Sequence, residues 1–315
     1  MNKKNIVIIG GGTASAGLLH GFFNYRNKYN LSVIGSLADN GGSNGKLQEE
    51  LGVTGLGGIR KCLLALSEEN ETIKNTWSYR FSQGGLTGHV VGNIFMAALE
   101  KTLGSAEKTL EVMHKILKVR GRVVPASFSH TALLAELENG QIIEGETNID
   151  ISKHDGKLKI TKVFLKPKIK ANPEALEKIK KAQLILIGPG DFYTTVIPNL
   201  LVDGISAALA KSKAKKVFVA NSITKYGETY GFSINNFIDA LEKYLGIGVL
   251  DYVLYNGRDP GSARVKLRHP EETYPALIPD KELEARYEFI DSNFIAAKGL
   301  PYYDKDKLVR AILKL

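Results

Sequence analysis

The sequence has few of the residues and runs that mark several protein classes. Its one cysteine, Cys62, excludes an internal disulfide, and its six histidines are scattered without the spacing of a zinc site. No stretch approaches the roughly 20 apolar residues that span a bilayer. The first apolar run, residues 6–9, ends at three glycines and is too short for a signal peptide. We therefore expect a cytoplasmic protein with no membrane-inserted segment.

The sequence also lacks a concentrated basic pattern. Its formal net charge of +9 comes mostly from lysines scattered among apolar residues, as in 157–170 and 211–216. Nucleic-acid-binding proteins more often gather Lys and Arg along one helix or interleave them with aromatic residues. We therefore expect no nucleic-acid partner, although the excess positive charge favours anionic small molecules.

Short continuous apolar runs, typical of strands buried on both faces, recur along the chain at residues 5–9, 31–37, 184–187, 216–220 and 251–255. Helical periodicity follows most of these runs or lies between them, at residues 16–29, 92–103, 106–118, 194–211 and 234–244. This alternation predicts an α/β fold with a Rossmann-like, doubly wound and mostly parallel sheet.

Residues 123–166 have a different character, because turn signals there mark antiparallel hairpins. Asn139-Gly140 separates 131–137 from 141–146, and Asp155-Gly156 separates 147–151 from 157–165. Each dipeptide can supply the positive φ of a tight hairpin turn. We expect a hairpin-rich insertion of about 123–166 within a single integrated domain, 1–315. Residues 260–301 show no clear period.

The first predicted strand leads through Gly10, Gly11, Gly12 and Thr13 straight into a helix. Glycines allow the backbone to approach a phosphate, and a helix start offers unpaired N–H groups and the positive end of a dipole. A tight turn without a ligand is the alternative. We prefer a phosphate site, because three consecutive glycines cost more conformational entropy than a turn requires.

The turn is not a complete dinucleotide fingerprint. Counting from Gly10, Ser15 stands where the third glycine of Gly-x-Gly-x-x-Gly belongs, and the next glycine is Gly17. Asp39 follows the second strand about where a ribose-binding acid would lie. These residues therefore leave an NAD-dependent dehydrogenase open as one possible function, although no other residues indicate a hydride-transfer site.

Three further loops follow predicted strands. In an open parallel sheet such loops converge at the carboxyl ends of the strands, where ligands bind. The loops comprise residues 39–47, 188–195 and 221–229, of which 39–47 is glycine-rich and the last two carry polar groups that could bind a phosphate, base or sugar.

Together the loops resemble the gluconeogenesis factor family, bacterial relatives of 2-phospho-L-lactate transferase. The resemblance covers nearly the whole chain and rests on ordered motifs, namely Gly10-Gly11-Gly12-Thr13, Ala38-Asp39-Asn40-Gly41-Gly42-Ser43, Gly57-Gly58-Ile59-Arg60, Tyr79-Arg80-Phe81, Gly88-His89 with Gly92-Asn93, Gly188-Pro189-Gly190 with Tyr193-Thr194, Ile197-Pro198-Asn199-Leu200-Leu201 and Gly227-Glu228-Thr229.

The resemblance implies a domain that binds a nucleotide or nucleotide sugar. In the bacterial branch it implies a UDP-sugar-like ligand and a regulatory role in carbon metabolism and cell-wall precursor supply. In the transferase branch it implies magnesium and the transfer of a phospholactyl-type group from a guanosine diphosphate donor to an alcohol.

The sequence departs from the family pattern mainly by losing charge. Asn40 follows Asp39 where the family usually has two acids, Gly58 replaces an acid, and Lys46 replaces an arginine. Asp191 adds a carboxylate where the family usually has serine. A paired carboxylate could hold Mg²⁺ against a pyrophosphate, and a single Asp39 is a poorer metal site. We therefore favour a binding protein that needs no cofactor, keep a magnesium-dependent transferase as the alternative, and regard Asp39 as the best candidate for a catalytic or metal-binding residue.

Single residues add to the candidate site. Arg60 follows a glycine-rich turn and its guanidinium could grip a diphosphate, although a structural ion pair is an equal alternative. His89 and Asn93 are four apart and share a face if a helix has begun. Cys62 lies in an apolar run and is expected in the core. A homodimer is compatible with the sequence. The predicted ligand-binding residues are Gly10, Gly11, Gly12, Thr13, Asp39, Asn40, Gly42, Ser43, Arg60, His89, Asn93, Gly188, Pro189, Gly190, Asp191, Tyr193, Thr194, Asn221, Thr224 and Glu228.

Overall fold

A computed structural model describes residues 3–258, 261, 264, 266, 279–291, 293–298 and 302–315. Its main sheet has seven strands in the order β3-β2-β1-β7-β8-β9-β10, and every neighbouring pair is parallel. The strands are β1 (Lys4–Gly10), β2 (Tyr29–Gly35), β3 (Arg122–Pro125), β7 (Leu184–Ile187), β8 (Lys215–Val219), β9 (Tyr252–Tyr255) and β10 (Glu288–Asp291). The predicted Rossmann-like, doubly wound α/β class is confirmed.

Alternation along β1 explains why its apolar run is continuous. Ile6 and Ile8 pack into the core on one face of the sheet, and Val7 and Ile9 pack into the core on the other. Successive side chains of a strand point to opposite faces, so a strand covered on both sides must be apolar at every position.

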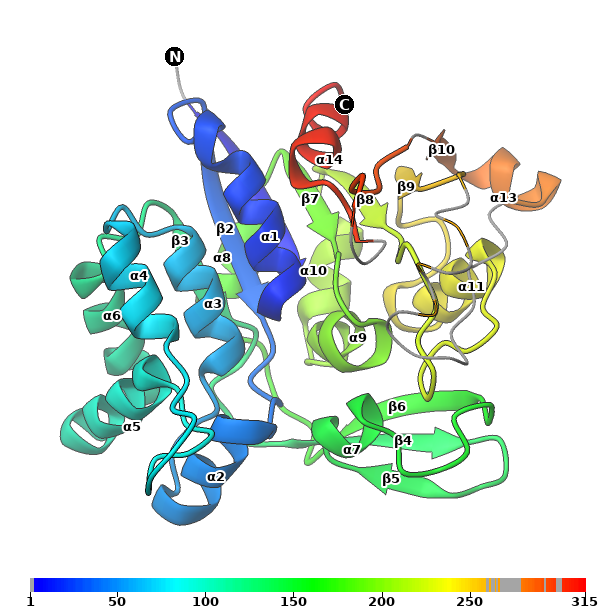
Figure 1. Ribbon diagram of the computed structural model, residues 1–315. Helices are drawn as coiled ribbons and strands as arrows, with labels where there is room; N and C mark the ends of the chain where they lie inside the picture. The colour runs from blue at the N-terminus through cyan, green and yellow to red at the C-terminus, as the bar shows by residue number, and fades with distance from the viewer. Residues whose placement is uncertain are drawn as a thin grey trace.

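Helices cover both faces of this sheet. The core that contains Ile6 and Ile8 is closed mainly by α1 (Gly12–Phe22), α3 (Gly57–Ala65), α6 (Ala106–Ile116) and α14 (Lys305–Ile312). The opposite core is closed by α8 (Pro173–Lys181), α9 (Ile197–Leu200), α10 (Ile205–Lys211) and α11 (Ile234–Leu245). In Figure 1, α1 and α14 lie in front of the sheet and α10 lies behind it.

The order of strands reverses at β1, which has β2 on one side and β7 on the other. Such a reversal opens a crevice beyond the carboxyl ends of the strands, where ligands of doubly wound folds bind. The turn after β1 and the loop after β7 both reach this crevice.

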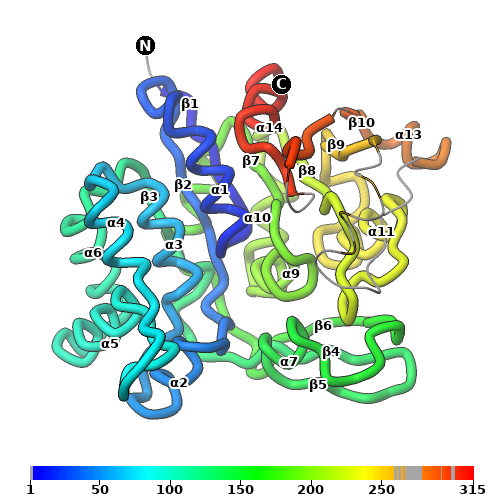
Figure 2. Tube along the Cα trace, viewed as in Figure 1, coloured from blue at the N-terminus to red at the C-terminus, as the bar shows by residue number. Residues whose placement is uncertain are grey.

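A separate antiparallel sheet, in the order β5-β4-β6, forms the predicted hairpin extension. Its strands are β4 (Ala132–Leu137), β5 (Ile142–Glu144) and β6 (Ile160–Lys166). Figure 2 shows this insertion below the ends of the main strands, on the side away from both chain termini. The first predicted hairpin is confirmed, and Gly140 adopts a φ of 83° in its turn.

The second predicted hairpin is wrong. Residues 147–151 do not form a strand, because they belong to the short helix α7 (Glu146–Asp150) and its C-terminal turn. Gly145, at a φ of 95°, turns the chain out of β5, and the Asn40 side chain accepts a hydrogen bond from the Thr147 N–H. The start of the predicted insertion also moves, because β3 belongs to the main sheet.

Several helix boundaries differ from the expected ones. The predicted helix 194–211 is divided into a π-helical segment (Phe192–Val196), α9 and α10, and Gly204 turns the chain before α10 at a φ of 100°. The helix predicted over 16–29 is α1 followed by a 3-10 turn (Phe23–Tyr25). The other described helices are α2 (Gly42–Leu51), which occupies much of the predicted loop 39–47, α4 (Glu71–Ser78), α5 (Val91–Leu103) and α13 (Lys281–Arg286).

Among the described residues, no helix is long and apolar enough to cross a membrane. Much of the segment 260–301, in which no period was readable, lies outside the described residues. The described part of this segment includes α13 and β10.

Candidate functional site

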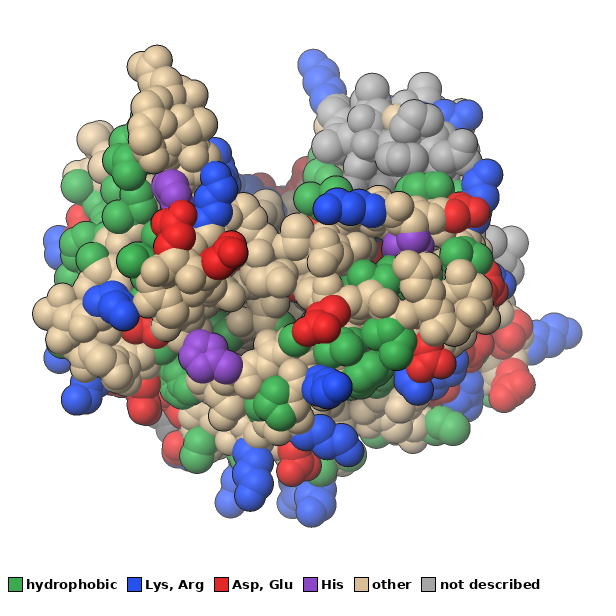
Figure 3. Space-filling view, turned by 90° about the horizontal axis from the view of Figure 1, so that it is seen from below, with side chains coloured by type: hydrophobic (Ala, Val, Ile, Leu, Met, Phe, Trp, Pro, Cys, Tyr) green, Lys and Arg blue, Asp and Glu red, His purple; other side chains and the backbone are tan. Residues whose placement is uncertain are grey.

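A cavity of about 640 Å³ lies at the switch point of the main sheet. Its walls come from the glycine turn, the loops after β2, β7 and β8, the helix α7 of the insertion, and the C-terminal segment with Tyr302, Tyr303 and Lys305. Figure 3 views the molecule from the carboxyl ends of the strands, and this face is hollowed near its centre. Backbone and small polar groups, drawn in tan, dominate the hollow. The volume is in the range of pockets that enclose small molecules.

The glycine turn forms one end of the cavity. Gly11 and Gly12 have φ values of 155° and 61°, the second of which is left-handed and favours glycine. The Gly11 N–H donates to Ser15 Oγ at 2.8 Å. The Ser15 hydroxyl therefore holds the turn in its conformation. The first N–H groups of α1 have no partner within the helix, so the turn presents donors and the positive end of a helix dipole to the cavity.

Two lysines add positive charge to the cavity lining. Lys61 of α3 lines the cavity, and its Nζ donates to Thr13 Oγ1 at 2.9 Å. Lys305, at the start of α14, also lines it. Sequence reasoning missed both lysines. Lys61 directly follows Arg60 in one of the family motifs, whereas only the fold brings Lys305 to the cavity.

Asp39 lines the cavity at the end of the loop after β2, where it is half-buried. Its Oδ1 accepts from the Gly41 N–H at 2.9 Å, and its Oδ2 accepts from Asn44 Nδ2 at 2.7 Å. Both oxygens are thus already engaged by their own loop. This arrangement holds the carboxylate in one orientation, and each of its oxygens keeps a further lone pair for a ligand.

Glu146 of α7 faces the same cavity. Burial and, after it, the charges of Asp39 and Asp150 raise the pKa of this carboxyl to about 8. At neutral pH Glu146 is therefore mostly protonated, and it can donate a hydrogen bond as well as accept one.

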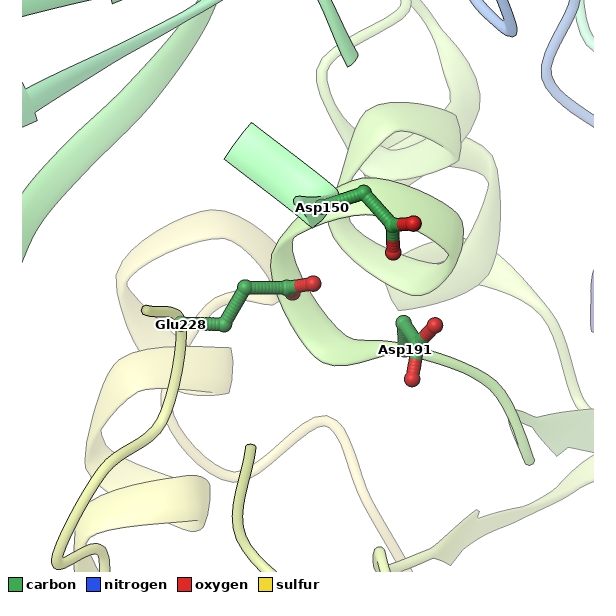
Figure 4. A group of neighbouring side chains, drawn as sticks. All are labelled: Asp150, Asp191 and Glu228. Carbon is green, nitrogen blue, oxygen red and sulfur yellow. The ribbon is translucent and has the colours of Figure 1, made fainter. Parts of the chain in front are cut away.

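Further acids lie in and behind the cavity wall. Asp150 and Asp191 line the wall, and Glu228 is buried behind them. Figure 4 shows the three carboxyl groups arranged around a common space. The ammonium of Lys225 forms ion pairs with Asp191 at 3.0 Å, with Glu228 at 2.7 Å and with Asp150. The cavity thus presents both cationic groups and carboxyl groups to its interior.

Arg60 lies outside the lining, although sequence reasoning placed it on a diphosphate. It is 5% exposed, and its Nε and Nη1 donate to Asn93 Oδ1 and to the Trp77 carbonyl. Asn93 Nδ2 in turn donates to Asn44 Oδ1 at 3.0 Å. Burial, and after it the charge of Arg80, lowers the pKa of Arg60 to about 10, which leaves it charged at neutral pH. Arg60 and Asn93 thus support the loop that holds Asp39.

Other predicted residues also serve as supports. His89 Nδ1 lies 3.4 Å from Ser43 Oγ, just before α5, so His89 and Asn93 do not share a helix face. The Tyr193 N–H and the Thr194 hydroxyl donate to the Glu228 carboxylate at 3.0 and 3.1 Å. These contacts order the loops behind the wall.

The structure divides the predicted ligand-binding residues, all of them described, into two groups. Those that line the cavity are Gly10, Gly11, Gly12, Thr13, Asp39, Gly42, Pro189, Gly190, Asp191, Thr194 and Asn221. Those that lie outside its lining are Asn40, Ser43, Arg60, His89, Asn93, Gly188, Tyr193, Thr224 and Glu228. Ligand binding by either group stays a prediction. The lining residues that sequence reasoning missed include Lys61, Glu146, Asp150, Tyr302 and Lys305.

Comparisons with known proteins agree with one another. The family model of 2-phospho-L-lactate transferase CofD matches residues 6–295. The chain is 40% identical over 288 residues to a gluconeogenesis factor of Halalkalibacterium halodurans, which covers 90% of this chain and 87% of that protein. It is 36% identical over 285 residues to the gluconeogenesis factor of Bacillus subtilis, covering 90% and 88% of the two chains.

A crystal structure of a member of the UPF0052 family from Bacillus halodurans has the same fold. It matches with a TM-score of 0.91 at 36% identity and covers 99% of each chain. The resemblance inferred from the loop motifs is confirmed by these matches. The chain belongs to the 2-phospho-L-lactate transferase CofD family, in which its curated relatives are gluconeogenesis factors.

Proposed function

We propose that this protein binds a nucleoside diphosphate sugar, such as a UDP-sugar, in the cavity at the switch point. It acts by binding, as a cytoplasmic regulator of carbon metabolism and cell-wall precursor supply. The observation that carries the proposal is the lining of one cavity by the glycine turn, two lysines and several carboxyl groups.

The cationic groups suit the diphosphate. The first N–H groups of α1, Lys61 and Lys305 all line the cavity. A helix N-terminus and lysine ammonium groups are common partners of phosphate oxygens.

The carboxyl groups suit the sugar. Asp150, Asp191 and the protonated Glu146 offer acceptors and a donor to hydroxyl groups. A carboxylate on the ligand would meet like charge beside Asp150 and Asp191, so a hydroxyl-rich sugar fits these groups better than a phospholactyl group does.

The family also implies magnesium, for which the motif around Asp39 lacks the paired carboxylate. The Asn40 side chain is an amide whose oxygen accepts from Thr147, and Gly58 offers no side chain. We therefore derive no catalytic step through a metal. Binding is the better supported role.

A thermal unfolding assay tests the proposal. UDP-sugars above their dissociation constant should raise the unfolding temperature, because they bind only the folded state. At about 100 times the dissociation constant, the stabilisation is about 2.7 kcal/mol. The panel should include GDP-linked sugars, UDP, NAD and NADP. If no nucleotide raises the unfolding temperature, the proposal is wrong.

Turnover distinguishes the transferase alternative. With a GDP- or UDP-linked phospholactate donor, Mg²⁺ and a deazaflavin alcohol acceptor, we expect no release of nucleoside monophosphate above background. Sustained release would establish the transferase instead.

A further inference from the structure

Lys225 sits at the centre of the acidic cluster Asp150, Asp191 and Glu228. Its ammonium contacts a carboxylate oxygen of each of the three acids. These acids come from three separate segments of the fold, namely the end of α7, the loop after β7 and the loop after β8. The Lys225 side chain is 12% exposed and that of Glu228 is fully buried. The contact is therefore an interior one that joins the insertion to the main sheet.

The three carboxylates have the spacing of a metal site. One oxygen from each lies within 4.8 Å of the other two, and among the described residues this is the group of acids or histidines with that property. Oxygen ligands at such spacing suit hard divalent cations. In this protein the ammonium of Lys225 occupies the space between them.

Glu228 is held in place independently of Lys225. Its two carboxylate oxygens also accept hydrogen bonds from the Tyr193 N–H and the Thr194 hydroxyl. Asp150 and Asp191 face the cavity, so a soluble ion could reach the cluster from that side. Without the lysine charge, Glu228 would therefore keep its position and the three acids would be accessible to an ion from the cavity.

The Lys225 ammonium offsets the charge of the acids around it. Three carboxylates this close would repel one another without a cation among them. A cation is thus an integral part of this wall.

We propose that Lys225 is the resident cation of the cavity wall, taking the place of a divalent ion among Asp150, Asp191 and Glu228. The wild-type protein then binds no divalent ion at this cluster, and its wall is neutralised without a metal. Replacement of the ammonium by an apolar group opens a divalent site. The inference goes beyond nucleotide binding and does not depend on it.

The experiment uses the full chain without any nucleotide and Mn²⁺ as the probe. Lys225→Met removes the charge and keeps the length of the side chain. We expect Lys225→Met to gain one Mn²⁺ site by isothermal titration calorimetry, with an affinity at least on the order of tenfold above that of the wild type. The double variant Lys225→Met/Asp191→Asn should lose the gain. Lys108→Met, an exposed lysine of α6, is the matched control and should behave as the wild type.

Thermal unfolding provides a second readout, which can be used even if Lys225→Met is less stable than the wild type. Mn²⁺ should raise the unfolding temperature of Lys225→Met and leave that of the wild type unchanged. If the variant folds poorly, Mn²⁺ should restore its folding and EDTA should not.

Two results would overturn the inference. One is a variant that gains neither affinity nor stability from Mn²⁺, including one that stays unfolded with the ion. The other is a wild-type protein that binds Mn²⁺ and loses it on Asp191→Asn. Neither result bears on nucleotide binding, so failure here is separable from failure of the proposed function.

Discussion

The Nε atom of Arg60 donates a hydrogen bond to Oδ1 of Asn93 at 2.7 Å. From Asn93 the bonds continue through Asn44 to the carboxylate of Asp39, which lines the cavity. Arg60 thus acts on the cavity through a chain of side-chain amides, at a distance from any ligand that the cavity holds.

This relationship predicts a loss of stability when Arg60 is replaced. Arg60→Met leaves Asn93 Oδ1 and the Trp77 carbonyl without their donor, and unpaired buried polar groups cost about 1–3 kcal/mol each. We expect the free energy of unfolding in urea to fall by about 2–6 kcal/mol. Arg310→Met, an exposed arginine of α14, is the control. Unchanged stability together with lost nucleotide affinity would instead make Arg60 a ligand contact.

The raised pKa of Glu146 predicts a pH dependence of stability. The folded carboxyl titrates at about 8, and an unfolded glutamate titrates near ~4.3. Between these values the folded state holds the extra proton, so the free energy of unfolding falls as pH rises through this window. Above about pH 8 this contribution is constant.

Glu146→Gln should remove that slope. The variant should gain stability relative to the wild type as the pH rises from about 5 to about 8, measured by urea unfolding across the range. Glu107→Gln, an exposed acid of α6, should show no such trend. Parallel curves for Glu146→Gln and the wild type would contradict the shift.

Substitution of Gly58 tests phosphate binding at the glycine turn without destabilising the fold. A Cβ at Gly58 would lie 3.6 Å from the Gly12 N–H nitrogen, in ordinary contact, on the cavity side. Gly58 is the second residue of α3, where alanine is the better helix former by up to ~1 kcal/mol. Gly58→Ala should therefore weaken nucleotide binding about tenfold by calorimetry while stability holds or rises.

Gly85→Ala is the matched control, because a Cβ there meets nothing within 4 Å and its backbone is unstrained. Equal nucleotide affinity in Gly58→Ala and the wild type would place the phosphate elsewhere.

Lys61 should contribute affinity through its charge. Lys61→Met removes an exposed ammonium beside Thr13, and a hydrogen bond to a charged group contributes about 1.5–3 kcal/mol. We expect nucleotide affinity to fall on the order of tenfold, and the remaining affinity to depend less on salt. Lys108→Met should leave both properties unchanged.

Cys62 should be chemically silent in the folded protein. It is completely buried, and burial raises the pKa of its thiol to about 12. Because the thiolate is the reactive form, we expect no reaction with a thiol reagent near pH 8 until urea unfolds the chain. Rapid labelling of the native protein would show that the α3 region opens.

The sequence was most informative where one pattern determined one outcome. The continuous apolar runs of β1 and β7 could only be doubly covered strands, and Gly140 could only be a turn. Residues 147–151 were misread because Asp155-Gly156 was interpreted as a hairpin turn, whereas Gly156 has no positive φ and the Asn40 side chain holds the start of a helix at 147. That contact spans 107 positions, so no local pattern reports it.

The residues of the site divide in the same way, into those that a local sequence pattern predicts and those that only long-range contacts place. Its glycine turn was readable because backbone geometry requires particular residues at Gly11 and Gly12. Lys305 and Glu146 carry no local signal, since only the packing of α14 on α1 and the placement of α7 bring them to the cavity. Arg60 is the opposite case, because its residue type suggested a phosphate contact and its buried side chain instead supports the Asp39 loop.

Ser15 links two positions that a motif search treats as separate. A Cβ on Gly10 would lie 2.7 Å from Ser15 Oγ, the atom that accepts from the Gly11 N–H. A larger residue at position 10 is therefore tolerable only where position 15 has lost its hydroxyl, and the turn then loses its anchor. Across related sequences, residues 10 and 15 should covary as a pair, and a search that demands glycine at both would pass over this turn.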